Sequence, residues 1–221
     1  MKVQLTVLFL ILVAFGLIFV LTQKQSISNI QSFVTEPTIS LPPDEFTAIP
    51  SPTPLPPEQQ AFLELQQTAQ ELVQNQASLS AIIKTLKGDI TIELYKSETP
   101  FAVANFYQKV QEGFYSGLIF HRVEDWVIQG GDPLGDGSGG GTTPTELTQK
   151  PFTLGSVGYA ASAQMPVRQG ERTSSGSQFF IVKQDADHLN GQYTNFGQVV
   201  NGMEVVEEIQ VGDKILGITI Q

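Results

Sequence analysis

The sequence predicts a mainly β domain over residues 81–221, built as a closed antiparallel barrel with two helices. Three observations favour this fold. Apolar and polar residues alternate in many short runs, as they do in strands with one buried face. Within residues 81–221, only two segments, 100–112 and 205–209, are predicted to be helical. Because many short strands leave exposed edges unless the sheet closes, we expect a barrel.

Near its N-terminus the chain has an apolar segment that is long enough to cross a membrane. Val3 to Leu21 contains only Gln4 and Thr6 as polar residues, and at about 1.5 Å per residue it spans roughly 28 Å. A cleaved signal peptide has a shorter apolar region and a small-residue cleavage site, which this segment lacks. We expect residues 1–22 to be a transmembrane anchor with the domain outside the cytoplasm; the alternative is secretion after cleavage.

A proline-rich stretch follows at residues 23–57, with prolines at 37, 42, 43, 50, 52, 54, 56 and 57. Proline interrupts helices and central strands, and such composition favours an extended polyproline II spacer. We expect a semi-rigid stalk between the anchor and the domain. A ligand for a proline-recognition module is the alternative.

Residues 58–80 are predicted to form an amphipathic helix. The apolar residues Phe62, Leu65, Ala69, Leu72 and Leu79 recur at helical spacing. The helix is short for an independent coiled coil, and an alanine and a glutamine weaken its apolar face. We expect it to pack on the following domain, with a partner-binding helix as the alternative.

The barrel elements follow in order. Alternation over 82–86 and 90–94 predicts a hairpin that turns at Lys87-Gly88-Asp89. Thr99 is predicted to cap a helix that begins at Pro100 and ends at Gly113. The further predicted elements are strands within 114–127, a glycine-rich loop at 135–141, strands at 152–162, 178–182 and 196–200, a helix at 205–209 and a strand at 215–220.

Residues 120–132 contain the side chains best suited to a binding site, in the order Phe-His-Arg-Val-Glu-Asp-Trp-Val-Ile-Gln-Gly-Gly-Asp. The pattern predicts a strand, a short turn and a second strand. Arg122 supplies a permanent cation, Gln129 an amide, and residues 126–128 a large apolar surface. No obvious nucleophile is present, and Arg122 taken alone is better explained by a structural salt bridge.

Three blocks of the sequence together resemble the cyclophilin family of peptidyl-prolyl cis–trans isomerases. They are Phe120–Asp132, Gly176–Ile181 and His188–Gly197, in the order and at the separation that the family shows. The resemblance covers about residues 81–221, and with the apolar segment the chain resembles a membrane-anchored, bacterial-type member. It implies an eight-stranded closed barrel capped by two helices, with a packed interior and the site on the outer wall.

The resemblance also implies the site and its chemistry. Arg122 would be the catalytic arginine, for rotation about an X–Pro bond without a metal or other cofactor. The substrate-binding residues would be Trp126, Val127, Gln129, Ala160, Ala161, Gln178, Phe180, His188, Leu189 and Tyr193. The implied partner is a proline-containing polypeptide, and we expect a monomer.

Five of these positions depart from the commonest family pattern. Trp126 replaces phenylalanine, Val127 methionine, Ala161 asparagine, Tyr193 histidine and His188 tryptophan. The last change argues against tight cyclosporin binding. None removes the arginine, so we expect activity. The alternatives are a non-catalytic module that binds proline segments and a scaffold whose predicted helix binds a membrane complex.

Composition and motifs argue against other classes of function. A net charge of −10 argues against nucleic-acid binding. The chain has no cysteine and two histidines, which excludes disulfides and argues against a zinc site. The glycine string 135–140 lacks the helix that a phosphate cradle needs, so we expect a surface loop, which the family resemblance places beside the groove. His121 is expected to pack facing away from Arg122, and the polar insertion 164–173 to form a loop.

Overall fold

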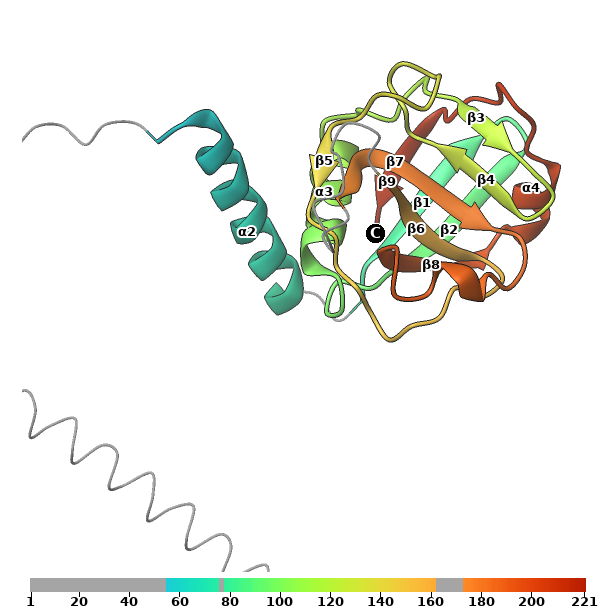
Figure 1. The fold of residues 1–221 in the computed structure, drawn as a ribbon. Helices are drawn as coiled ribbons and strands as arrows, with labels where there is room; N and C mark the ends of the chain where they lie inside the picture. The colour runs from blue at the N-terminus through green and yellow to red at the C-terminus, as the bar shows by residue number, and fades with distance from the viewer. Residues whose placement is uncertain (1–54, 76–77, 162–172) are drawn as a thin grey trace, which may run out of the picture. The chain divides into compact units, whose positions relative to one another are not determined.

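The structure is a computed structural model that describes residues 55–75, 78–161 and 173–221 (Figure 1). The predicted anchor, almost all of the proline-rich stretch and most of the polar insertion lie outside these residues. Within the described ranges, no helix combines the length and the apolar character needed to cross a membrane.

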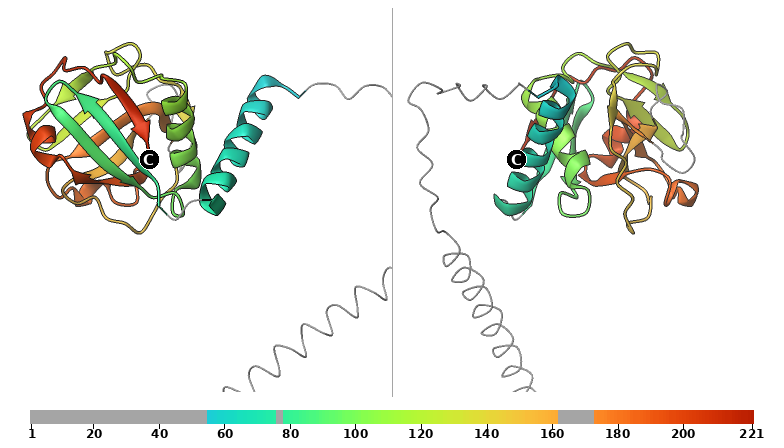
Figure 2. Two further views of the ribbon diagram at one scale, coloured as in Figure 1. Left: turned by 180° about the vertical axis from the view of Figure 1, so that it is seen from behind. Right: turned by 60° about the vertical axis from the view of Figure 1, so that its left-hand side comes forward.

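Nine antiparallel strands form one sheet that curls around a hydrophobic core (Figures 1 and 2). The strands are β1 (Ser80–Thr85), β2 (Gly88–Leu94), β3 (Phe120–Val123), β4 (Val127–Gly130), β5 (Thr142–Thr143), β6 (Ser156–Ala161), β7 (Ser174–Val182), β8 (Asn195–Asn201) and β9 (Gly217–Ile220). Their spatial order is β3-β4-β7-β6-β8-β2-β1-β9, and β5 pairs with β7. Aromatic rings fill the inside of the curl, where Phe106 contacts Tyr115, Phe179 and Phe196.

The sheet is an open half-barrel, so the prediction of a closed eight-stranded barrel is wrong. β3 and β9 stand at the two ends of the strand order, and no ladder between them is found in the described part of the chain. A single bridge between Ile119 and Lys214, outside both strands, joins the two ends. Four backbone hydrogen bonds between residues 117–120 and 212–215 accompany this bridge, whereas β3 and β9 themselves do not pair within the described residues.

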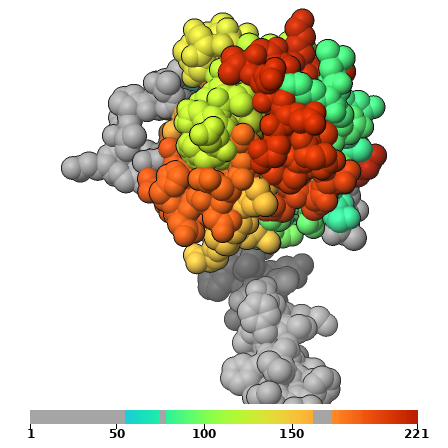
Figure 3. All heavy atoms as spheres, turned by 90° about the vertical axis from the view of Figure 1, so that its right-hand side faces the viewer, coloured from blue at the N-terminus to red at the C-terminus, as the bar shows by residue number. Residues whose placement is uncertain are grey.

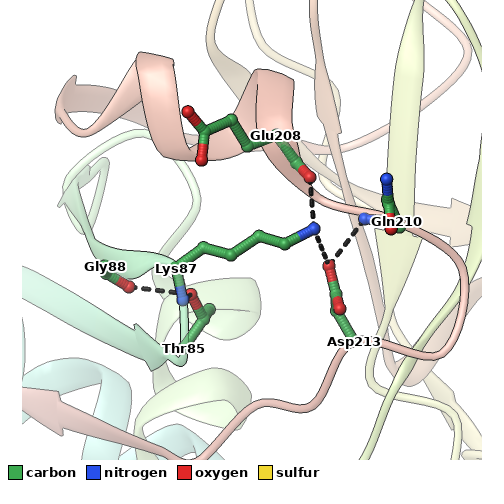
Figure 4. Close-up of polar contacts among 6 residues, drawn as sticks. All are labelled: Thr85, Lys87, Gly88, Glu208, Gln210 and Asp213. Atoms are coloured by element: carbon green, nitrogen blue, oxygen red, sulfur yellow. Dashed lines mark hydrogen bonds and ion pairs between the residues drawn. The ribbon is translucent and has the colours of Figure 1, made fainter.

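A turn precedes β9 in the segment that lies beside β3. The Asp213 carboxylate accepts a hydrogen bond of 2.7 Å from the backbone N–H of Gln210, and this bond holds residues 210–213 in a turn. Lys87 fastens the turn to the β1–β2 hairpin, because its Nζ lies 2.7 Å from Asp213 Oδ2 and also donates to the carbonyl of Glu208 (Figure 4). The chain therefore approaches β3 as an irregular segment.

Two helices lie at opposite sides of the curled sheet (Figures 1 and 2). They are α3 (Pro100–Gln111) and the short α4 (Met203–Glu208). Thr99 occupies the N-cap position of α3 as predicted, but its side chain does not cap the helix, because its hydroxyl donates to the carbonyl of Tyr95. The carboxylate of Glu146 instead accepts from the N–H groups of Phe101 at 3.2 Å and Ala102 at 2.7 Å.

The helix α2 (Pro57–Asn75) packs on α3. Its residues Leu65, Ala69 and Leu72 are buried in the main core. Gln108 of α3 donates to the hydroxyl of Thr68 at 2.8 Å. The helix ends at Asn75 and not at residue 80 as predicted. Leu79 lies in the approach to β1 because its carbonyl accepts from the N–H of Leu94 at 2.8 Å.

Candidate active site

The β3–β4 hairpin places Arg122 and Gln129 opposite each other. The two residues are paired in the strand register, and Arg122 Nη1 lies 3.3 Å from Gln129 Oε1. The turn is closed by a hydrogen bond of 2.8 Å from the N–H of Glu124 to the carbonyl of Val127. Trp126 therefore lies in the turn between the strands, and the arginine lies on the strand before it.

A pocket of about 230 Å³ lies against this hairpin. It is lined by Arg122, Trp126, Val127, Gln129, Ala160, Ala161, Phe180, Leu189 and Tyr193. All nine belong to the residues that the sequence suggested for the site, and they come from four strands, the β3–β4 turn, the 3₁₀ helix η1 (Asp187–Leu189) and the segment after it. Figure 3 shows the hairpin, in yellow-green, beside the orange segment that contains η1.

The pocket walls belong to a second apolar cluster, separate from the main core. Val127, Phe180 and Leu189 are among its buried residues, and Trp126 and Tyr193 pack against it. The rings of Phe180 and Tyr193 meet edge to face, with centroids 5.9 Å apart. A rigid apolar wall of this kind suits the burial of a small saturated ring.

A glycine in β6 allows the Phe180 ring to lie close to the sheet. A Cβ added at Gly158 would lie 2.5 Å from the Phe180 ring and 2.7 Å from that of Phe152. Such distances are far below ordinary contact, so any larger residue would displace one of the rings. Gly158 therefore sets the depth of the pocket at this wall.

The remaining two predicted site residues, Gln178 and His188, lie beside the pocket lining. Gln178 is buried, accepts a hydrogen bond of 2.9 Å from Gln129, and donates to the carbonyls of Gly137 at 3.0 Å and Gly139 at 2.8 Å. Its amide is thus engaged within the protein. The His188 ring lies against Trp126, with centroids 5.3 Å apart.

The glycine-rich loop is wrapped around the carboxylate of Asp132, which the sequence did not single out. Asp132 is 1% exposed. It accepts hydrogen bonds from the backbone N–H groups of Leu134 (3.1 Å), Asp136 (3.0 Å), Gly137 (2.6 Å) and Gly139 (3.0 Å). These donors already have an anionic acceptor, so they are unavailable to a phosphate.

Glu124 is a second residue of the site that the sequence did not single out. Its Oε1 lies 2.7 Å from Arg122 Nε, and its Oε2 accepts from the indole N–H of Trp126 at 2.8 Å. Chiefly because of the hydrogen bond from Arg122, the pKa of Glu124 is lowered. The alternating positions 122, 124 and 126 were the only sequence signal for this contact.

His121 offers no support for an acid–base mechanism. Both ring nitrogens are buried, and neither has a hydrogen-bond partner among the described residues. Burial lowers the pKa of this histidine. The described ranges also hold no group of three or more histidine, cysteine, aspartate or glutamate side chains that could bind a metal ion.

The sequence of this chain is similar to one family model and to curated proteins that carry the same family description. Residues 80–217 match the sequence model of a family described as cyclophilin type peptidyl-prolyl cis-trans isomerase/CLD. A peptidyl-prolyl cis-trans isomerase of Synechococcus elongatus is 38% identical over 63% of this chain and 94% of its own length. Peptidyl-prolyl cis-trans isomerase B of Bacillus subtilis is 43% identical over 56% of this chain and 85% of its own length.

Solved structures show the same similarity. A cyclophilin type peptidyl-prolyl cis-trans isomerase of Cryptosporidium parvum superposes with a TM-score of 0.59 at 28% identity, and covers 65% of this chain and 98% of its own. The same protein solved in the presence of the dipeptide Ala-Pro gives a TM-score of 0.57 at 29% identity, and covers 64% of this chain and 98% of its own.

Proposed function

This chain belongs to the cyclophilin-type family of peptidyl-prolyl cis–trans isomerases, and we propose that Arg122 and the pocket beside it carry its catalytic activity. The enzyme catalyses rotation about X–Pro peptide bonds and so assists protein folding. The observation that carries the proposal is the pocket itself, in which one guanidinium borders an apolar wall.

The reaction breaks no covalent bond. The barrier to rotation is about 18–20 kcal/mol because the C–N bond has partial double-bond character. An acceleration of 10⁵-fold requires roughly 7 kcal/mol of binding that is stronger in the transition state than in the ground state. The absence of an obvious nucleophile in the 120–132 stretch is therefore no obstacle.

Arg122 stabilises the twisted amide. At the transition state the amide nitrogen becomes pyramidal and regains a lone pair, and the carbonyl loses conjugation. A fixed donor that points at this group favours the twisted state, and one such donor is typically worth about 3–4 kcal/mol. The remaining acceleration comes from the apolar wall, which orients the proline ring and excludes the water that favours the planar amide.

The other pocket residues hold the substrate. The ring of a proline fits against Phe180, Leu189 and Val127, with Trp126 and Tyr193 at the sides. Gln129 presents its amide to the peptide backbone, and the exposed Ala161 borders the groove with Ala160. The substrate is a proline-containing polypeptide, an assignment supported by the related structure solved in the presence of Ala-Pro.

We further propose that the chain is a membrane-anchored, bacterial-type isomerase whose domain lies outside the cytoplasm. The apolar segment Val3–Leu21 supports the anchor, and the proline-rich stretch after it supports a spacer. In a membrane fractionation, the full chain should remain with the membrane through a carbonate wash and dissolve only in detergent. Release by carbonate would contradict the anchor.

The catalytic assignment is tested by replacing the arginine. With the full chain and an X–Pro tetrapeptide, Arg122→Ala should lower kcat/KM by about 10²- to 10³-fold. Arg122→Lys keeps the charge but loses the planar fork of donors, so its activity should be intermediate. Unchanged turnover in Arg122→Ala would remove Arg122 from the mechanism. An inert but folded wild type would favour a non-catalytic proline-binding module.

A further inference from the structure

Glu124 lies at the edge of the pocket and contacts two of its lining residues at once. One carboxylate oxygen is 2.7 Å from Arg122 Nε, and the other accepts the indole N–H of Trp126 at 2.8 Å. The guanidinium also lies over the Trp126 ring, with Cζ 5.5 Å from the ring centroid. The three side chains therefore form a closed triangle on one face of the hairpin.

The triangle contributes little to folding stability. The Arg122 and Glu124 side chains are 43% and 44% exposed. Ion pairs this exposed contribute little to stability because solvent screens them and their long side chains lose entropy. Folding stability therefore does not account for these contacts, whereas orientation of the Arg122 and Trp126 side chains does.

The contacts leave one end of the guanidinium free to act. Nε is held by Glu124 and Nη1 contacts Gln129 at 3.3 Å. Nη2 has no hydrogen-bond acceptor among the described residues, and Arg122 lines the pocket. A flexible arginine samples many rotamers, and each one that points elsewhere reduces the time spent in the productive geometry.

We infer that Glu124 is a positioning residue, whose carboxylate holds the Arg122 guanidinium and the Trp126 indole in the geometry that the reaction needs. The inference rests on the proposed role of Arg122 and adds a residue to it. A single carboxylate supplies two acceptor oxygens, whereas an amide supplies one. With glutamine in this geometry, one of the two donors, Arg122 Nε or the Trp126 indole, would face an N–H₂ group and lose its acceptor.

The first test is kinetic and uses a neighbouring acid as the matched control. In the full chain, Glu124→Ala should lower kcat by about tenfold, and Glu124→Gln should fall between Glu124→Ala and the wild type. Asp125→Asn removes a charge from the same turn, where no hydrogen bond or ion pair of Asp125 is found among the described residues. It should keep the wild-type kcat. Trp126→Phe keeps an aromatic ring but loses the N–H, and should reproduce part of the Glu124→Ala effect.

The second test is spectroscopic and independent of turnover. Trp126 is the single tryptophan of the chain, so its fluorescence reports on the contact directly. In the part of the chain that the structure describes, the other ionisable groups beside Glu124 or the indole are Arg122, Asp125 and His188. As pH falls, protonation of Glu124 should change the emission at a midpoint below the usual glutamate pKa of about 4.3. The step should be absent in Glu124→Gln and should persist in His188→Gln.

The outcomes separate this inference from the catalytic assignment. If Arg122→Ala loses activity while Glu124→Ala keeps the wild-type kcat, Glu124 does not position the arginine and the inference fails alone. An equal loss in Asp125→Asn would show a general charge effect and would also overturn it. If Arg122→Ala retains activity, the catalytic assignment fails whatever Glu124 does. An acid step in fluorescence that survives Glu124→Gln would exclude the contact with Trp126.

Discussion

The side-chain amides of Gln129 and Gln178 are joined by a hydrogen bond of 2.9 Å between Nε2 of the first and Oε1 of the second. Gln129 lines the pocket, whereas Gln178 is buried and held by the glycine-rich loop. The bond fixes which end of the Gln129 amide faces Arg122, because the donor end is already occupied. The loop therefore influences the site without touching the substrate.

Removing the Gln178 amide should damage both stability and turnover. Gln178→Leu leaves two loop carbonyls and the Gln129 N–H without partners, which should cost about 1–3 kcal/mol in unfolding free energy. The kcat/KM for an X–Pro peptide should fall as well. Urea unfolding and the exchange assay measure the two effects. Gln210→Leu, an exposed position outside the pocket, is the control and should change neither. Wild-type turnover in Gln178→Leu would show that the loop does not orient Gln129.

The Asp132 carboxylate should be needed for the order of the glycine-rich loop. Asp132→Asn keeps the shape but turns an N–H₂ group toward backbone donors, so we expect a loss of about 2–3 kcal/mol in unfolding free energy. Amide hydrogen exchange at residues 134–139 should become faster. Asp136→Asn is the control, because the Asp136 side chain is exposed and its carboxylate accepts hydrogen bonds from Ser138, not from the loop N–H groups that Asp132 holds. Equal effects of the two changes would contradict the central role of Asp132.

Glu146 should stabilise α3 from outside the helix. Glu146→Ala removes the acceptor of two N–H groups in the first turn, at a cost of about 1 kcal/mol. The melting temperature should fall accordingly. Glu98→Ala breaks only an exposed ion pair with Lys150 and should have almost no effect. A larger effect of Glu98→Ala than of Glu146→Ala would show that the helix is not capped in this way.

Burial of His121 should make folding stability depend on pH. Its pKa is lowered in the folded state, mainly by burial and with the charge of Arg122 acting in the same direction, although Asp132 and Asp136 oppose the shift. The folded protein therefore binds the proton less well than the unfolded chain. The stabilisation is complete above the unfolded pKa of about 6.5 and is lost as pH falls through the lower folded value.

Urea unfolding of the wild type and His121→Phe at pH 7.5 and pH 5.5 checks this dependence. The wild type should lose more unfolding free energy than the variant between the two values. His188 is the second of the chain's two histidines, so His188→Gln serves as the control and should keep the wild-type pH dependence. If His121→Phe lost as much unfolding free energy as the wild type between the two pH values, His121 would not be the source of the pH dependence.

The sequence predicted the individual strands and helices better than it predicted whether the sheet closes into a barrel. Alternation located the β1–β2 hairpin, and helical spacing located α3. The unpaired edges of β3 and β9 and the contact of Lys87 with the turn around Asp213 are long-range features, which no local pattern reveals. Likewise, Thr99 was the local candidate for a cap, but Glu146 reaches the helix from 44 residues away.

For the site, the sequence motifs named residues that the fold does bring together around one pocket, while their catalytic and binding roles stay predictions. Local reasoning passed over Glu124 and Asp132 because an acidic residue in a turn is common and usually solvated. Only the structure shows that Glu124 accepts the hydrogen bond of the Trp126 indole and that Asp132 accepts those of the loop N–H groups.

The central claim is that Arg122 acts on the transition state and not merely on substrate binding. NMR exchange spectroscopy on an X–Pro peptide, titrated with full-chain protein up to saturation, measures the dissociation constant from the titration and the rate of interconversion on the enzyme at saturation. We predict that Arg122→Ala slows the bound interconversion by about 10²-fold or more while changing the dissociation constant far less. A variant that binds more weakly but interconverts the bound peptide at the wild-type rate would contradict the account.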